Sequence, residues 1–178
     1  MPISNAVPKD TRKSFIDFLL KVAEHDKRVM LIIGDVGFRY IESFKDKFPN
    51  QFLNAGAAEQ NMMGMAAGLS RVGWKPYIYT MINFIVFRPY EQVRNDLAYG
   101  NANVKLFGVK GSEAYKFLGH SHNVYPVDNF QMIRELDEDQ QLMDHLPNFK
   151  TYYPDTDVEA KEFMNFEYQR EGPAYFRI

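Results

Sequence analysis

Apolar positions along the chain follow two spacings, one typical of buried strands and the other typical of helices. Short or continuous apolar runs predict strands at 28–33, 52–56, 74–80, 104–109, 151–153 and 173–177. Apolar residues three and four apart predict helices at 10–24, 41–48, 57–69, 83–99, 129–135 and 158–170. Asp10 is the expected cap of the first helix, and Pro89 is expected to interrupt the fourth. Because strands alternate with helices, the sequence predicts an α/β fold, a three-layer α/β/α domain with a mostly parallel central sheet.

The interval 54–69 combines a strand end, a turn and a helix whose residues are small or apolar around most of its circumference. Glu59 is the charged residue of this interval, and a first-turn glutamate is favoured by the helix dipole on any helix. Here the apolar surroundings predict that Glu59 is buried, and a buried carboxylate needs a specific partner. Gly64 and Gly68 each weaken a helix by about 1 kcal/mol relative to alanine. They therefore predict close packing against another backbone.

Composition and charge narrow the class of protein. The 178 residues are predicted to form one domain, spanning 1–178, and they include no cysteine. A net charge of −2 with mixed signs gives no basic footprint for nucleic acid. Without an apolar run of membrane-spanning length or a signal-peptide pattern at 1–5, no membrane contact is expected and a cytoplasmic protein is predicted. The acidic run 137–139 is expected to be a solvated surface patch.

From 55 to 80 the chain reads AGAAEQNMMGMAAGLSRVGWKPYIYT. This interval resembles the pyrimidine-binding (Pyr) domain of transketolase-type thiamine diphosphate enzymes, whose pattern here is G-x-x-E-[QH]-x-M-x-G-x-A-x-G-x-A-x-x-G-x-x-P. The match continues through Phe84 and Arg88 to 91–94 and 119–122, and coarser similarity covers nearly the whole chain. The resemblance implies the thiamine diphosphate-binding, Pyr-type fold.

The resemblance implies cofactor-binding roles for four residues. Glu59 matches the catalytic glutamate that bonds N1′ of the cofactor's aminopyrimidine in the family. Phe84 stands where an aromatic side chain stacks on the pyrimidine ring, and Phe87 lies one turn further on. Asp35 aligns with an aspartate near the cofactor. From the residues alone, core packing of the two phenylalanines and a turn-capping role for Asp35 remain open.

Substrate contacts are expected on the irregular interval that follows the fourth strand. The resemblance makes His122 a candidate catalytic residue that faces the substrate, with His120 and Arg88 as further substrate-binding candidates. The family carries Gly-Glu-Asp-Gly before this histidine, whereas 114–119 reads AYKFLG. Met81 also replaces a frequent aromatic residue. The substrate pocket is therefore expected to differ from that of a standard sugar-phosphate transketolase.

The chain lacks the Gly-Asp-Gly motif and later asparagine through which the family holds Mg²⁺ and the diphosphate. It also lacks a Walker-type loop, a zinc-ligand pattern and a nucleophile elbow, so no metal ligand is expected in this chain. The resemblance implies a split enzyme, in which a diphosphate-binding (PP) domain subunit holds Mg²⁺ and thiamine diphosphate lies across the interface. An α2β2 hetero-oligomer is the family's usual arrangement.

Three functions fit the resemblance. The leading interpretation is the Pyr-domain subunit of a transketolase-like enzyme that transfers a two-carbon ketol unit between sugar-like substrates. One alternative is the β-type subunit of a 2-oxo acid dehydrogenase or decarboxylase, or a deoxysugar synthase relative. The other is a non-catalytic partner module of the same fold. The runs EQNM at 59–62 and SHN at 121–123 favour the first, and a scaffold has no use for Glu59, Phe84 and His122 together.

Overall fold

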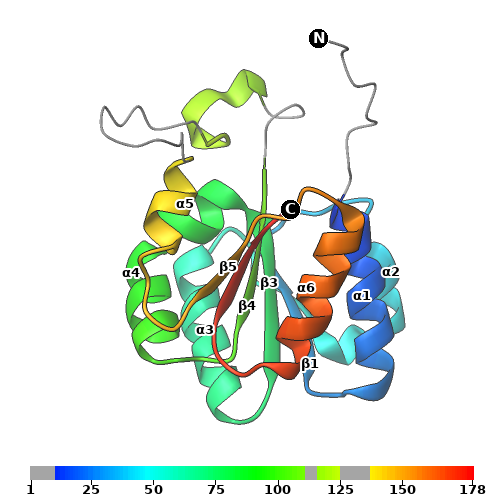
Figure 1. Ribbon diagram of the computed structural model, residues 1–178. Coiled ribbons are helices and arrows are strands. Elements are labelled where there is room, and N and C mark those ends of the chain that lie inside the picture. Colours follow the sequence, from blue (N-terminus) through cyan, green and yellow to red (C-terminus); the bar gives the residue numbers. More distant parts are fainter. Residues whose placement is uncertain (1–10, 111–115, 125–136) are drawn as a thin grey trace.

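The computed structural model describes residues 11–110, 116–124 and 137–178, so the predicted cap Asp10 and the predicted helix 129–135 lie outside it. Its centre is one sheet in the strand order β2-β1-β3-β4-β6-β5 (Figure 1). The strands are β1 Val29–Ile33, β2 Phe52–Asn54, β3 Lys75–Met81, β4 Lys105–Val109, β5 Lys150–Tyr152 and β6 Ala174–Arg177. All neighbouring strands pair in parallel, which confirms the predicted α/β class.

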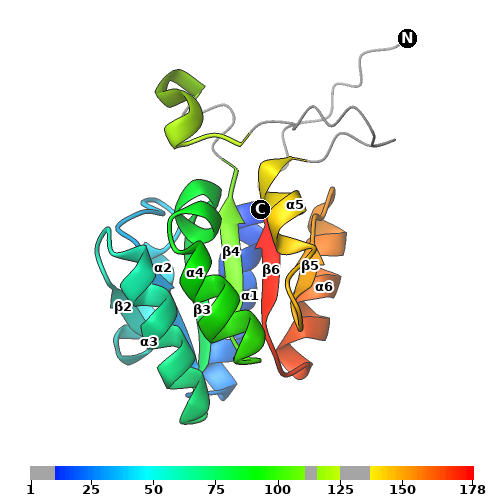
Figure 2. The ribbon, with the colours of Figure 1, turned by 90° about the vertical axis from the view of Figure 1, so that its left-hand side faces the viewer.

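Helices cover both faces of the sheet, as the three-layer prediction requires (Figure 2). They are α1 Thr11–His25, α2 Glu42–Lys47, η1 Pro49–Gln51, α3 Glu59–Arg71, η2 Asn83–Phe87, α4 Tyr90–Gln92, η3 Val93–Tyr99, η4 Lys116–Ser121, α5 Glu138–Met143 and α6 Asp157–Gln169. One face packs against α1, α2 and α6, and the other against α3, η2, η3 and α5. Within the described ranges, no helix combines the length and the apolar character needed to cross a bilayer.

The helix predicted at 83–99 differs from a regular α-helix. It consists of two π-helical segments, η2 and η3, joined by the short α4 that follows Pro89. In η2 the backbone N–H of Arg88 donates to the carbonyl of Asn83, five residues earlier, at 3.2 Å. π-Helical turns are rare and occur frequently at functional sites. This wider turn carries Phe84, for which the resemblance implies a cofactor-binding role.

The two faces of the sheet carry cores of different character. On the α1 face aromatic rings stack, with the ring centroid of Phe107 in β4 lying 3.9 Å from that of Phe15 and 4.5 Å from that of Phe176. On the α3 face the core is mainly aliphatic and includes the fully buried Met62. Successive residues of a strand point to opposite faces, so β4 sends Phe107 into one core and Leu106 into the other. Both faces of the central strands are therefore fixed by packing.

A charged pair is buried between β4 and the end of α6. Lys105, which is 3% exposed, donates through Nζ to Oε2 of the similarly buried Glu167 at 2.9 Å. The same Nζ donates to the backbone carbonyls of Arg170 and Gly172 at 3.1 and 2.7 Å. Burial lowers the pKa of Lys105 to about 8, and its hydrogen bond to Glu167 opposes that fall. The ammonium therefore remains charged at neutral pH and links the strand to the helix.

Candidate functional site

The carboxyl ends of parallel strands meet at one edge of the sheet, where open α/β folds place their ligands. Asp35 follows β1, Glu59 follows β2, Asn83 follows β3, and the interval 116–124 follows β4 along the chain. The residues that the sequence predicts for the site therefore come from one edge, the upper edge of the sheet in Figure 1.

Glu59 is the first residue of α3 and is 2% exposed, which confirms its predicted burial. Nη1 of Arg88 donates to both carboxylate oxygens, at 3.0 and 2.9 Å. This ion pair offsets the cost of removing the carboxylate from water. The side chain of Arg88 is itself 48% exposed. The buried carboxylate is thus covered by a partner that borders solvent.

Phe84 in η2 joins this ion pair to one of the predicted histidines. The guanidinium carbon of Arg88 lies 4.1 Å from the centroid of the Phe84 ring. The ring of His122 meets Phe84 edge to face, with centroids 5.0 Å apart. Nδ1 of His122 in turn lies 2.8 Å from the hydroxyl oxygen of Ser121. We call the contiguous set Glu59, Arg88, Phe84 and His122 the Glu59 cluster.

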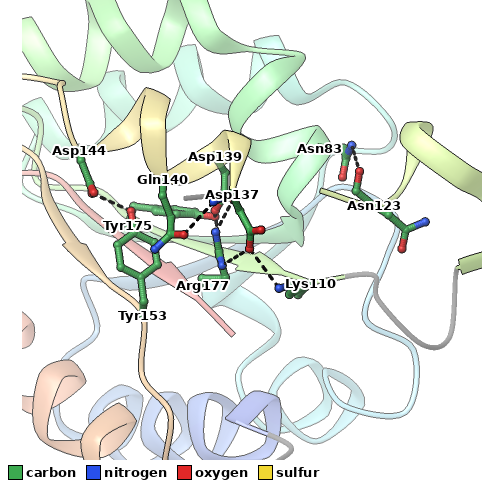
Figure 3. A network of polar contacts seen from close by, with 10 residues as sticks. All are labelled: Asn83, Lys110, Asn123, Asp137, Asp139, Gln140, Asp144, Tyr153, Tyr175 and Arg177. Atoms are coloured by element: carbon green, nitrogen blue, oxygen red, sulfur yellow. Dashed lines mark hydrogen bonds and ion pairs between the residues drawn. The ribbon is translucent and has the colours of Figure 1, made fainter. Parts of the chain in front are cut away.

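A side-chain amide holds the interval 116–124, here called the histidine segment, against η2. Nδ2 of Asn83 donates to the backbone carbonyls of His120 and Asn123 at 2.9 and 3.2 Å, and Figure 3 draws the second bond. His120 is exposed and contributes its carbonyl to this link. The structure therefore brings His122, rather than His120, to the Glu59 cluster.

Phe87 and His120 line a separate hollow at the same edge, a cavity of about 430 Å³. The other lining residues are Asn83, Glu138, Gln141 and Leu142. Phe87 also packs against the core on the α3 face. Phe87 therefore has the core-packing role that the sequence left open. It also forms one wall of the cavity, one turn from Phe84.

Asp35 is exposed, with a left-handed backbone at φ 56°. Its backbone N–H donates to Oδ1 of Asn54, and Nδ2 of Asn54 donates back to its carboxylate, both at 3.1 Å. These bonds join the residue after β1 to the end of β2, and the partner of the carboxylate is a side chain 19 residues away rather than the backbone of its own turn. Asp35 also lines a cavity of about 170 Å³ with Tyr79 and Met81. The structure thus places Asp35 at the predicted edge of the sheet, beside a different cavity from the one that Phe87 and His120 line.

The prediction of a solvated acidic patch at 137–139, where α5 begins, is wrong. Asp139 is 0% exposed and accepts hydrogen bonds from the hydroxyl of Tyr175 at 2.7 Å and from Arg177 at 2.6 and 3.0 Å (Figure 3). Asp137 accepts from Arg177 at 2.6 Å and from Lys110 at 3.1 Å. Burial is possible because β6 and the end of β4 supply cationic partners for both carboxylates. These residues, the Asp139 network, fix the start of α5 to the sheet edge.

Removing the tyrosine hydroxyl tests the Asp139 network. Burial holds the pKa of Tyr175 well above its usual range, so its hydroxyl remains the donor to Asp139. We expect Tyr175→Phe to lower the free energy of unfolding by about 1.5–3 kcal/mol, measured by urea titration, because a buried carboxylate loses a hydrogen bond. Tyr153→Phe is the matched control, since that hydroxyl donates to the exposed Asp144. Equal losses in the two variants would contradict the buried role.

The sequence analysis did not single out Asn83, although its amide makes the link to the histidine segment. A usable signal exists, because Asn83 is the polar residue of the otherwise apolar run MINFIVF at 81–87. A buried polar side chain needs hydrogen-bond partners. Here those partners are backbone carbonyls some forty residues further along, which the sequence alone does not identify.

The protein is thus a parallel α/β domain with a buried carboxylate, an aromatic ring and a histidine at the carboxyl edge of its sheet, the edge at which such domains place their ligands. The chain belongs to the family described as "Transketolase, pyrimidine binding domain", which matches residues 7–178. The predicted resemblance is therefore confirmed.

Relatives of the chain differ in their described activities. It is 42% identical over 113 residues to an apulose-4-phosphate transketolase subunit of Phocaeicola vulgatus, covering 63% of this chain and 36% of that protein. It is 30% identical over 167 residues to the 1-deoxy-D-xylulose-5-phosphate synthase of Macrococcus caseolyticus, covering 92% of this chain and 24% of that protein. A solved structure described as "Split gene transketolase, inactive beta4 tetramer" superposes with a TM-score of 0.78 at 30% identity, covering 95% of this chain and 50% of the chain in that structure. The chain thus spans half or less of the length of these relatives.

Proposed function

We propose that this chain is the Pyr-domain subunit of a split transketolase-like enzyme that transfers a two-carbon ketol unit between sugar-like substrates. Thiamine diphosphate would lie between this chain and a PP-domain subunit. The observation that carries the proposal is Glu59, a buried carboxylate at the carboxyl edge of the sheet in a member of this family.

The side chain of Arg88 provides a test of whether the residues present fit the cofactor. Its guanidinium is planar, donates N–H groups to Glu59 and lies over the face of Phe84. An aminopyrimidine is also planar, and its ring nitrogen N1′ can share a proton with a carboxyl group, so the same carboxyl group and the same aromatic face could serve it. The carboxylate and the ring therefore fit the group, and the half-exposed Arg88 has room in solvent to move aside.

Three residues of the Glu59 cluster, Glu59, Phe84 and His122, have separate tasks in this proposal. Glu59 would hold a proton at N1′ of the pyrimidine, and Phe84 would stack on its ring. His122, beside Phe84, would face the substrate and bind or move a proton at its oxygen atoms. When bound, thiamine diphosphate supplies the electron sink for breaking and forming the carbon–carbon bond.

The missing half of the site favours a partner subunit. In the described part of the chain, no group of three or more acidic or histidine side chains could hold a metal ion. We therefore assign Mg²⁺ and the diphosphate to the PP-domain subunit. Gly64 and Gly68, predicted to pack against another backbone, face open space within the described ranges. An obligate α2β2 interface would cover this bare strip of α3 and bury at least about 2,000 Å² in total.

Isolation of the chain with its native partners tests the proposal. We expect a hetero-oligomer with bound thiamine diphosphate, whereas the chain alone binds none, because its sequence lacks the Gly-Asp-Gly motif for the diphosphate. Complex mass and cofactor content are measured on the same sample. A monomer or homodimer with neither partner nor cofactor would favour the non-catalytic module. Release of CO₂ from a 2-oxo acid, without ketol transfer, would favour the decarboxylating alternative.

A further inference from the structure

The side chain of Asn83 binds the backbone on both sides of His122. Its Nδ2 donates to the carbonyl of His120 at 2.9 Å and to that of Asn123 at 3.2 Å. These two carbonyls flank Ser121 and His122 in the chain. Figure 3 shows the asparagine on one segment facing Asn123 on the other. A single amide thus fixes the part of the histidine segment whose ring meets Phe84.

The turn around His122 is shaped by local bonds. The carbonyl of Gly119 accepts the backbone N–H groups of His122 and Asn123 at 3.1 and 3.2 Å, and Nδ2 of Asn123 at 2.8 Å. Gly119 has φ 60° and ψ −149°, a conformation that residues with a Cβ rarely adopt. These bonds give the turn its form, whereas Asn83 attaches it to η2.

Stability alone does not account for an asparagine at this position. Asn83 is 8% exposed, and its Oδ1 is buried without a hydrogen-bond partner among the described residues. An unpaired buried acceptor costs about 1–3 kcal/mol. Reversing the amide would point Oδ1 at two carbonyl oxygens, so the donating orientation is the favourable one. The side chain of Asn83 therefore fixes the histidine segment through Nδ2, at the cost in stability of an unpaired Oδ1.

We propose that Asn83 is a positioning residue that sets the place of His122 against Phe84. The inference rests on the proposed function, because it concerns the same site. Asn83 and Phe84 are adjacent in the π-helical turn η2, so one backbone unit carries both the aromatic wall and the anchor of the histidine. Phe84 belongs to this turn, and Asn83 of the same turn binds the backbone around His122. Both rings are therefore held by one element, which preserves their edge-to-face contact.

The test replaces the amide of Asn83 with an apolar side chain of similar size. In the reconstituted complex, Asn83→Leu is expected to lower kcat about 10- to 100-fold, because a misplaced group loses its alignment with the reacting atoms. The Kd for thiamine diphosphate should change less than about threefold, since Glu59 and the ring of Phe84 are untouched. A merely structural defect would not produce this split.

Gln51→Leu is the matched control. Gln51 is similarly buried, and its Nε2 donates to the carbonyls of Asp26 and Val29 at 3.1 and 2.9 Å. It precedes β2, at the amino-terminal edge of the sheet, and so lies away from the site. Like Asn83→Leu, this variant loses two hydrogen bonds from a side-chain amide to backbone carbonyls. It is expected to leave kcat near that of the native complex.

Hydrogen exchange on the isolated chain gives a readout that does not depend on activity. Exchange of the backbone N–H groups of His122 and Asn123 should accelerate at least about tenfold in Asn83→Leu and remain unchanged in Gln51→Leu. If the native complex transfers no ketol unit, the proposed function fails while this comparison still decides the anchoring role. Unchanged exchange, or equal loss of kcat in both variants, would overturn the inference. Asn83→Ala replaces the leucine variant if that variant does not fold.

Discussion

Glu59→Ala is expected to reduce turnover of the reconstituted complex by about 10²- to 10⁴-fold, the range that positioned acid–base groups supply. The variant removes the carboxylate that would hold a proton at N1′ of the pyrimidine. Folding should survive, because the cation that remains, Arg88, is 48% exposed and can turn into solvent. Steady-state assay of ketol transfer, beside circular dichroism of the isolated chain, measures both effects.

A carboxylate on the neighbouring helix supplies the control for Glu59. Glu91 in α4 is exposed, so Glu91→Ala changes the net charge equally without touching the Glu59 cluster. Its turnover is expected to stay close to that of the native complex. Turnover of Glu59→Ala that equals that of Glu91→Ala would remove the catalytic assignment.

Lys105→Met should produce the largest loss of stability among these variants, about 3–5 kcal/mol, the cost of stranding one member of a buried ion pair. The methionine fills the space of the lysine stem but leaves Glu167 and two backbone carbonyls without their shared donor. Arg170 and Tyr152 still donate to Glu167, so the lower end of the range is expected. Urea unfolding of the isolated chain gives the free energy.

An exposed lysine–carboxylate pair is the control that separates the effect of burial from the effect of losing a charge. Lys13 in α1 donates to Asp17 one turn away, and both side chains border solvent. Lys13→Met should therefore leave the urea midpoint nearly unchanged, because exposed pairs contribute little. A midpoint for Lys105→Met as high as that for Lys13→Met would show that the buried pair does not stabilise the fold.

The sheet could be predicted because its signal is local. Strands buried on both faces need continuous apolar runs, and runs such as 104–109 identify β4 to within one residue. Burial of Glu59 followed in the same way from its uncharged neighbours. The π-helical form of 83–99 could not be predicted, because apolar spacing does not distinguish a wide turn from a regular one over so short a length.

Interactions between distant parts of the chain account for the rest. The acidic run at the start of α5 is predicted to be a solvated patch because the partners of Asp139 lie 36 and 38 residues away in β6. The pairing of Glu59 with Arg88, 29 residues apart, is hidden for the same reason. For Gly64 and Gly68 the missing information is of another kind, because nothing in the part of the chain that the structure describes covers them.

The ion pair between Lys110 and Asp137 has a consequence for how such proteins diversify. It brings two points of the chain together at the sheet edge, one directly after β4 and the other directly before α5. The cost of closing a loop grows only slowly with its length, so residues between such points can be exchanged, added or lost with little effect on the sheet. Evolution can therefore replace the interval between Lys110 and Asp137, which carries the candidate His122, without rebuilding the sheet. The buried carboxylate and its aromatic neighbour lie outside that interval and stay with the scaffold.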